Sequence, residues 1–158
     1  LDTALTTYIK NTDNATEAMK GITKIATQSE VNAGVDDTKI VTSKKLKTLF
    51  GGSNVNLATN GYCKLPNGLI KQWGWSMIPP IQNGLGSFVE QSITFPIVFP
   101  NACLGVIITG SADSGDDGIE ALHSAMYRDK NKVIIRSYRM VGAYSGVPGS
   151  VSWQAIGY

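Results

Sequence analysis

The stretch Gly61-Tyr-Cys-Lys-Leu-Pro-Asn-Gly-Leu-Ile-Lys-Gln-Trp-Gly74 decides the fold of this chain. Two short strand-like runs, 62–65 and 69–73, flank Pro66-Asn67-Gly68. Proline sets its own φ near about −65°, and Asn-Gly tolerates positive φ, so the segment predicts a tight β-hairpin. The runs 62–65 and 69–73 are therefore expected to pair as the first two strands of the sheet.

The chain after Gly61 keeps to a strand pattern up to its C-terminus. The runs 106–108 and 133–135 are β-branched, which is typical of strands buried on both faces. Joints rich in Gly, Ser and Asp separate such runs, and this spacing predicts an antiparallel β-sandwich. The predicted strands are 62–65, 69–75, 88–94, 103–110, 119–128, 132–139 and 151–157.

The N-terminal part predicts a stalk. Its apolar and small residues recur at steps of 4 and 3, the a/d spacing of a coiled coil. Thr and Asn residues lower the helix propensity, so the seam needs several copies of the chain to be helical, and a disordered linker is the alternative. The residues expected to form this seam most strongly are Leu5, Tyr8, Met19 and Ile22.

Two short helices are expected after the seam. Thr27 and Glu30 have the spacing of a capping box, and Gly34 is a natural stop. A second helix is expected to follow Thr42 or Ser43.

All three Trp and all six Pro lie beyond residue 60, so we divide the chain into a helical stalk, neck and linker, 1–60, and a β-sandwich tip, 61–158.

Charge and cysteine usage exclude several classes of function. The net charge is +2, from 14 basic and 12 acidic residues, without a basic block that would neutralise nucleic-acid phosphates. No apolar run is long enough to span a membrane, so membrane insertion is not expected, nor is a charged-then-apolar leader. Cys63 and Cys103 lack further zinc ligands, so free, buried thiols are expected, and no cofactor is implied. A disulfide is the alternative, because pairing depends on whether the two strands are neighbours.

The hairpin sequence resembles the motif that opens the C-terminal domain of many bacteriophage tail-fibre proteins, Gly-Tyr-x-Lys-Leu-Pro-x-Gly-Leu-Ile-x-Gln-Trp-Gly. The likeness continues in Phe95-Pro-Ile-Val-Phe-Pro-Asn-Ala-Cys103 and in the ending Trp153-Gln-Ala-Ile-Gly-Tyr158. The run 26–46 is similar to an element found just before that domain, with Ser43 at the position of a usual proline. Three ordered motifs and this neck element make the resemblance specific.

This resemblance implies a parallel homotrimer that forms the receptor-binding tip of a tail fibre. Its function would be adsorption to a bacterial surface receptor, either lipopolysaccharide or an outer-membrane protein, without catalysis. The resemblance also implies a virion location after assembly in the host cytoplasm, with a fibre-assembly chaperone as an open question. The alternatives are a polysaccharide depolymerase and a purely structural trimerisation module.

The parity of the strands selects candidate receptor residues. In an antiparallel arrangement the connections 76–87, 111–118 and 140–150 share one end, and they are the longer and more polar set. The other set, 66–68, 95–102 and 129–131, would share the opposite end. The candidates for receptor contact are Asp113, Ser114, Asp116, Asp117, Tyr144, Ser145 and Arg139.

Catalytic and metal-binding interpretations have weaker support. Three of the tip's six carboxylates sit in the Gly-rich loop 113–118, which is poorly suited to hold a catalytic acid, and that loop lacks EF-hand spacing. His123 is the sole histidine, and a strand histidine bonded to a neighbour is expected. In a trimer three copies of His123 facing the axis would offer an alternative metal site.

Overall fold

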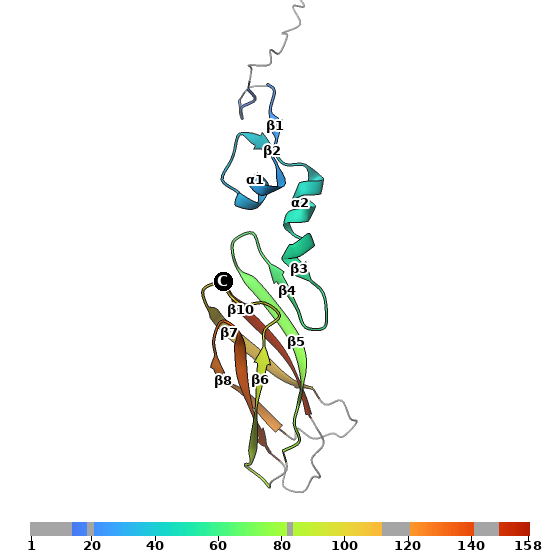
Figure 1. Cartoon of the computed structure of the whole chain (residues 1–158), viewed down its shortest axis with the longest axis vertical. Helices are drawn as coiled ribbons and strands as arrows, with labels where there is room; N and C mark the ends of the chain where they lie inside the picture. The colour runs from blue at the N-terminus through green and yellow to red at the C-terminus, as the bar shows by residue number, and fades with distance from the viewer. Residues whose placement is uncertain (1–13, 19–20, 82–83, 112–120, 141–148) are drawn as a thin grey trace, which may run out of the picture. The chain divides into compact units, whose positions relative to one another are not determined.

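We describe the fold from a computed structural model of the whole chain, which is drawn in Figure 1. The structure describes residues 14–18, 21–81, 84–111, 121–140 and 149–158. The chain divides into two compact units, Leu1–Gly52 and Ser53–Tyr158. The predicted division lay after residue 60. The structure differs because β3 (Val55–Asn56) already pairs with the first strand of the tip hairpin.

The first unit contains two short helices and a small parallel ladder. Helix α1 (Gln28–Ala33) has the predicted capping box of Thr27 and Glu30, and Gly34 ends it with φ 63°. Helix α2 (Ser43–Leu49) begins after Thr42, whose side chain accepts a hydrogen bond from the Lys45 backbone. The strands β1 (Lys24–Ile25) and β2 (Lys39–Ile40) pair in parallel. Both helices therefore form where their local signals predict.

The expected helical seam does not form in the described part of residues 1–22. Asn14 makes a parallel β-bridge to Ile22, and the Ala15 N–H donates to the Ile22 carbonyl at 3.2 Å. Neither 14–18 nor 21–22 is helical, and Ile22 is 41% exposed. The seam is expected to be helical only when several copies bury it, so the coiled coil stays a prediction. Leu5, Tyr8 and Met19 lie outside the described residues.

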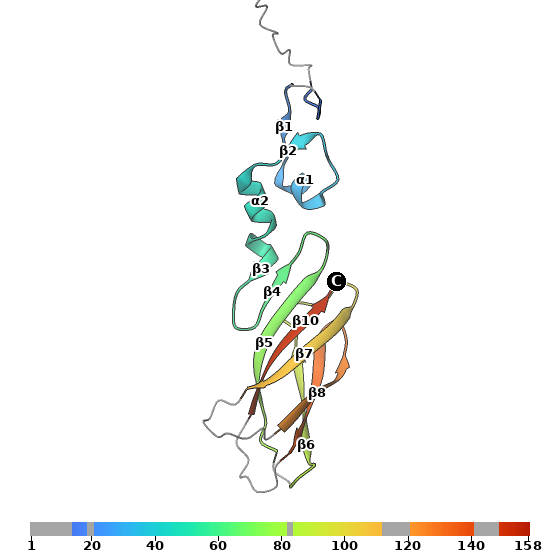
Figure 2. The same cartoon turned by 180° about the vertical axis from the view of Figure 1, so that it is seen from behind.

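The second unit is mainly β and is built from two antiparallel sheets, as predicted. One sheet has five strands in the order β3-β4-β5-β10-β7, and the other has three in the order β6-β9-β8. Figures 1 and 2 show the two sheets from opposite sides. The bounds are β4 Gly61–Lys64, β5 Ile70–Ile78, β6 Phe88–Thr94, β7 Cys103–Ser111, β8 Ala121–Arg128, β9 Lys132–Arg139 and β10 Gly149–Gly157.

The predicted hairpin is present, and its turn has the predicted chemistry. Strands β4 and β5 pair antiparallel, and the Leu65 N–H donates to the Leu69 carbonyl at 2.8 Å. Gly68 has φ 86°, a backbone conformation that favours glycine. The second predicted turn, 129–131, is also formed, with the Asp129 carboxylate accepting from the Asn131 and Lys132 backbones.

The three sequence motifs meet in the core. Gln72 is fully buried, donating from Nε2 to the Ile97 carbonyl at 2.9 Å and accepting from the Ile97 N–H at 3.0 Å. Phe95 packs against both Phe99 and Trp153, with ring centroids 5.2 and 5.6 Å apart. These motif residues thus join the hairpin, the 95–102 connection and the C-terminal strand into one packed unit.

Candidate functional site

Strand pairing brings the ends of six strands to one end of the tip, which we call the connection end. Ser111 pairs with Ser150 and Gly149 pairs with Ile78 in the five-stranded sheet. In the other sheet Ala121 pairs with Arg139. The β5–β6, β7–β8 and β9–β10 connections all start and finish here, so the parity argument holds for the strands that flank them.

Arg139, the one described receptor candidate, is buried at this end. Only 7% of it is exposed, since it lies on the inner face of β9. Its Nη1 donates to the Ile81 carbonyl at 2.9 Å, and its backbone exchanges hydrogen bonds with Gly86 and Ser87. The expectation of an exposed arginine is not met. Arg139 instead holds the β5–β6 connection against the end of β9.

An aromatic and arginine cluster lies beside the connection end on the outer face of the three-stranded sheet. Register places Phe88, Tyr138 and Leu122 side by side, and Phe88 is 50% exposed. The Arg136 guanidinium lies 4.4 Å from the Phe88 ring centroid and donates from Nε to Glu90 at 2.9 Å. We call Phe88, Glu90, Leu122, Arg136 and Tyr138 the outer cluster.

The charge of Arg136 is already used within the outer cluster. Nη2 also donates to Glu90, and Nη1 donates to the Tyr138 hydroxyl at 3.2 Å. These hydrogen bonds to Tyr138 and Glu90 raise the pKa of Arg136 above its ordinary value. The guanidinium charge is therefore paired with Glu90, and the group lies over the Phe88 ring. It does not offer an open site for a phosphate.

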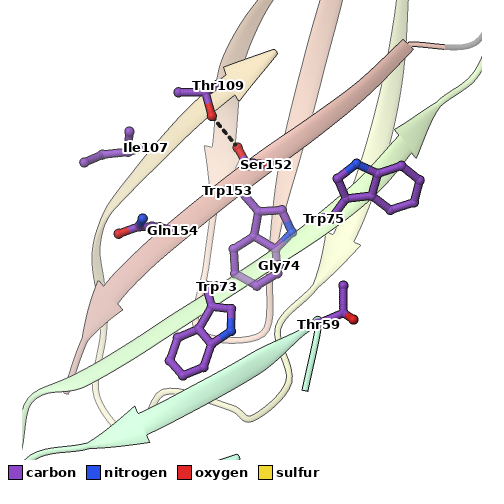
Figure 3. A pocket seen from close by; sticks show the side chains of 9 residues that line it. All are labelled: Thr59, Trp73, Gly74, Trp75, Ile107, Thr109, Ser152, Trp153 and Gln154. Carbon is purple, nitrogen blue, oxygen red and sulfur yellow. Dashed lines mark hydrogen bonds between the residues drawn. The ribbon is translucent and has the colours of Figure 1, made fainter. Parts of the chain in front are cut away.

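A groove lies on the outer face of the five-stranded sheet (Figure 3). Its volume is about 370 Å³. Trp73 and Trp75 project from β5 on one side, and β10 forms the floor. The Trp73 Nε1–H donates to the Ala58 carbonyl at 3.2 Å, which fixes the indole. The lining residues are Thr59, Trp73, Gly74, Trp75, Ile107, Thr109, Ser152, Trp153 and Gln154.

The remaining candidates from the sequence fall into two groups. Asp113, Ser114, Asp116, Asp117, Tyr144 and Ser145 lie outside the described residues. His123 faces inward and its Nδ1 lies 2.7 Å from the Ser137 hydroxyl, while burial lowers the pKa of its imidazole. The expected histidine bonded to a neighbour is present.

The two cysteines are free, as expected, although both are half-buried rather than fully buried. Cys63 lies on β4 and Cys103 on β7, with β5 and β10 between them. Three strand spacings of about 4.8 Å exceed the reach of a disulfide.

Within the described ranges, no group of three or more His, Cys, Asp or Glu side chains is placed to hold a metal ion. No helix in that part of the chain is long and apolar enough to cross a membrane.

Solved structures similar to this chain include pyocin tail fibres. An N-truncated R1-type pyocin tail fibre is 27% identical, with a TM-score of 0.54 over 66% of this chain and 84% of that chain. A C-terminal part of the P. aeruginosa R1 pyocin fibre is 20% identical, with a TM-score of 0.57 over 91% of this chain and 40% of that chain. The second likeness concerns the fold alone. The first likeness places this fold in the class of tail-fibre β-sandwiches.

The sequence of the tip identifies the protein family of this chain. Residues 64–158 match the family described as putative tail fibre protein gp53-like, C-terminal, and the chain belongs to that family. The chain is also 36% identical over 104 residues to an uncharacterised protein of Methanocaldococcus jannaschii, MJ0347. It spans 63% of the length of that relative.

Sequence reasoning missed the outer cluster and the groove as sites. Trp73 and Trp75 are two residues apart in a predicted strand, which places both on one face and was a usable signal. Phe88, Arg136 and Tyr138 come from two strands whose pairing is non-local, so no spacing in the sequence brings them together. Both sites depend on the order of strands in the sheets.

Proposed function

We propose that this chain is the tip of a homotrimeric tail fibre that binds a receptor on the bacterial surface. The observation that carries the proposal is the match of residues 64–158 to a tail-fibre C-terminal domain. The receptor is a surface glycan such as lipopolysaccharide or an outer-membrane protein, and binding is reversible and non-catalytic. The chain acts in the assembled particle, after folding in the host cytoplasm, with or without a fibre-assembly chaperone.

The geometry of the connection end supports this proposal. Six strand ends and the outer cluster lie together, so a rigid scaffold presents three connections next to an exposed aromatic surface. Phe88 at 50% and Leu122 at 56% exposure offer apolar contact area, and Glu90 offers a hydrogen-bond acceptor. Aromatic faces beside polar groups are well suited to sugar rings and to protein loops.

Trimer formation is supported by the amount of apolar surface that a single chain exposes. The outer faces of both sheets carry large apolar side chains that are exposed by two fifths or more, and contiguous patches of this kind mark contact surfaces. Three copies on one fibre would strengthen weak receptor contacts through avidity, by about 10²-fold or more. Outside the outer cluster and away from the connection end, the exposed residues include Leu104 and Ile156 on one sheet and Met126 and Tyr127 on the other.

The test is adsorption of the purified, labelled chain to host-range bacteria and to strains with truncated lipopolysaccharide, with its solution mass recorded. We expect a mass of three times 16.9 kDa and saturable binding. Loss of binding on truncation identifies a glycan receptor, and retention identifies a protein receptor. Phe88→Ala should weaken adsorption by about tenfold, whereas Val98→Ala, exposed at the opposite end, should not.

Three results would count against the proposal. A trimer that adsorbs to no strain would leave a structural module. A solution mass equal to that of a monomer would contradict the trimer and the gain in affinity through avidity. Release of oligosaccharide from purified lipopolysaccharide or capsule would show a depolymerase, in conflict with the proposed non-catalytic binding.

A further inference from the structure

We propose that the groove on the five-stranded sheet binds one or two residues of an uncharged saccharide. This inference rests on the proposed function, because it names the chemical class of receptor that the tip would contact. It also adds a site away from the connections. Trp73, Trp75, Ser152 and Gln154 are the residues assigned to the sugar.

The register of the sheet builds this groove from two parallel rows of side chains. Trp75, Ser152 and Thr109 form one row, and Trp73, Gln154 and Ile107 form the next. Rows separated by two residues lie about 7 Å apart along the strands, so the indoles offer two neighbouring apolar surfaces. The volume of about 370 Å³ is within the range of small-ligand sites.

The indole of Trp73 is held in place by its surroundings. Its Nε1–H donates to Ala58, and Gly61 lies against the ring, so that a Cβ at Gly61 would come within 2.7 Å of the Trp73 Cζ2 atom. Trp75 is 37% exposed, and its backbone N–H donates to the Asn60 side chain at 2.8 Å. A rigid aromatic wall loses little conformational entropy when a ligand stacks on it.

Polar groups on the floor remain available for ligand hydroxyls. Neither the Ser152 hydroxyl nor the Gln154 side-chain amide makes a hydrogen bond to any residue that the structure describes. Thr109 donates to the Ser152 carbonyl at 3.4 Å, which leaves its oxygen lone pairs free to accept. A pyranose ring has apolar C–H faces and polar hydroxyls around its edge. The indole faces fit the former, and the unused hydroxyl and amide groups fit the latter.

The charge of the lining selects the class of sugar. All nine lining residues are uncharged, so the groove offers nothing to a phosphate or carboxylate that would lose its hydration. Lys71 is the nearest cation on this face by register, one row further from the connection end than Trp73. The groove therefore fits neutral hexoses, deoxyhexoses or N-acetylhexosamines better than the acidic parts of a surface glycan.

The groove also lies close to the connection end. The row of Trp75 and Ser152 is followed directly by the row of Met77, Ser150 and Ser111, where β5 and β7 approach their ends. A glycan that reaches the connection end can therefore continue along the sheet into the groove. This continuity distinguishes the groove from an isolated surface depression.

The experiment screens the full chain against an array of glucose, galactose, rhamnose and N-acetylglucosamine oligomers, with phosphorylated and sulfated oligomers as charged controls. The strongest hit is then titrated by calorimetry into the unmodified chain and into Trp75→Ala and Gln154→Ala. Met77→Ala is the matched control, because Met77 shares the strand and the face but does not line the groove.

We expect a neutral oligomer to bind, and both groove variants to lose affinity by about tenfold while Met77→Ala keeps it. Absence of any neutral hit, or binding unchanged in both groove variants, overturns the groove. A Trp75→Ala variant with a smaller solution mass shows that a second copy occupies this face, which also overturns it. If no neutral oligomer binds but Trp75→Ala still adsorbs to bacteria, the groove proposal is wrong. The proposed function of the tip is then unaffected.

Discussion

Gln72 illustrates how a residue of the hairpin motif serves the fold rather than the receptor. Its amide donates to and accepts from the backbone of Ile97, which ties β5 to the 95–102 connection. A polar side chain is tolerated in the core because both ends of the amide are satisfied. Trp153 and Phe95 also serve the fold, because their rings pack in the core.

Replacing Gln72 by Met keeps the side-chain volume but leaves both backbone groups of Ile97 without their partner. Each unmade buried hydrogen bond costs about 1–3 kcal/mol, so the loss of two in Gln72→Met should destabilise the tip by about 2–6 kcal/mol. Urea unfolding followed by Trp fluorescence measures this. Gln154→Met, an exposed glutamine on β10, is the control and should stay within about 0.5 kcal/mol. Equal stability of the two variants would contradict the role given to Gln72.

Gly74 permits the close approach of the Trp153 indole to β5. A Cβ at this position would lie 2.5 Å from Trp153 Cζ2 and would also overlap the Asn60 side chain. Gly74→Ala should therefore force a shift in the packed core and cost about 1–3 kcal/mol. Gly105, in β7, has open space where its Cβ would be, so Gly105→Ala should be neutral or slightly stabilising. Thermal unfolding of both variants checks the contrast.

At the scale of the element, helix α1 is fastened by charges as well as by its cap. Glu30 accepts from the Thr27 backbone at 2.8 Å and pairs with Lys39 of β2, while Asp36 pairs with Lys39 at 2.8 Å. The Lys39 ammonium, followed by Thr27, lowers the pKa of Glu30 from 4.5 to about 2, and Lys39 also lowers the pKa of Asp36. The ion pair thus links α1 to the parallel ladder.

This linkage predicts how the first unit responds to acid. A carboxyl whose folded pKa is lowered contributes stability above its unfolded value, and the contribution is lost as pH falls through the folded value. For Glu30 that window runs from about 4.5 down to about 2. NMR titration should give a Glu30 carboxyl midpoint near 2, and Lys39→Met should move it upwards. A midpoint near 4.5 in the unmodified chain would contradict the capping geometry.

On the scale of the whole molecule, the order of strands decides the chemistry of the cysteines. Two strands separate Cys63 from Cys103, so no disulfide should form within a chain. Burial raises the pKa of the Cys103 thiol above its ordinary value of 9.0, which lowers its thiolate fraction at any given pH. Both residues should be alkylated after denaturation without reductant, as measured by mass spectrometry. In the folded chain Cys103 should react more slowly than a free cysteine peptide.

The likeness to tail fibres also has a limit at this scale. The family match covers residues 64–158 and not the first unit, and the motif residues Gln72 and Trp153 within that range are buried. We expect residues that face outward, such as Phe88 and Trp75, to decide which receptor is bound. Sequence likeness in the core therefore predicts the scaffold better than the ligand.

Local signals determined much of this protein from the sequence by itself. The Asn-Gly turn, the capping box of Thr27 and Glu30, and the strands β6 and β9 formed where predicted, because each depends on residues that are close in the chain. The a/d repeat before residue 22 stays a prediction, because a helix there needs further copies of the chain to bury its seam.

Only the tertiary structure decided where function can reside. Arg139 turned inward while Arg136 stacked on Phe88, and no property of the two arginines in the sequence separates them apart from the parity of their strand. The groove needs β10 to lie between β5 and β7, which pairs segments that are far apart in the sequence. Such non-local pairings are set by the total burial of the core, which a local pattern does not contain.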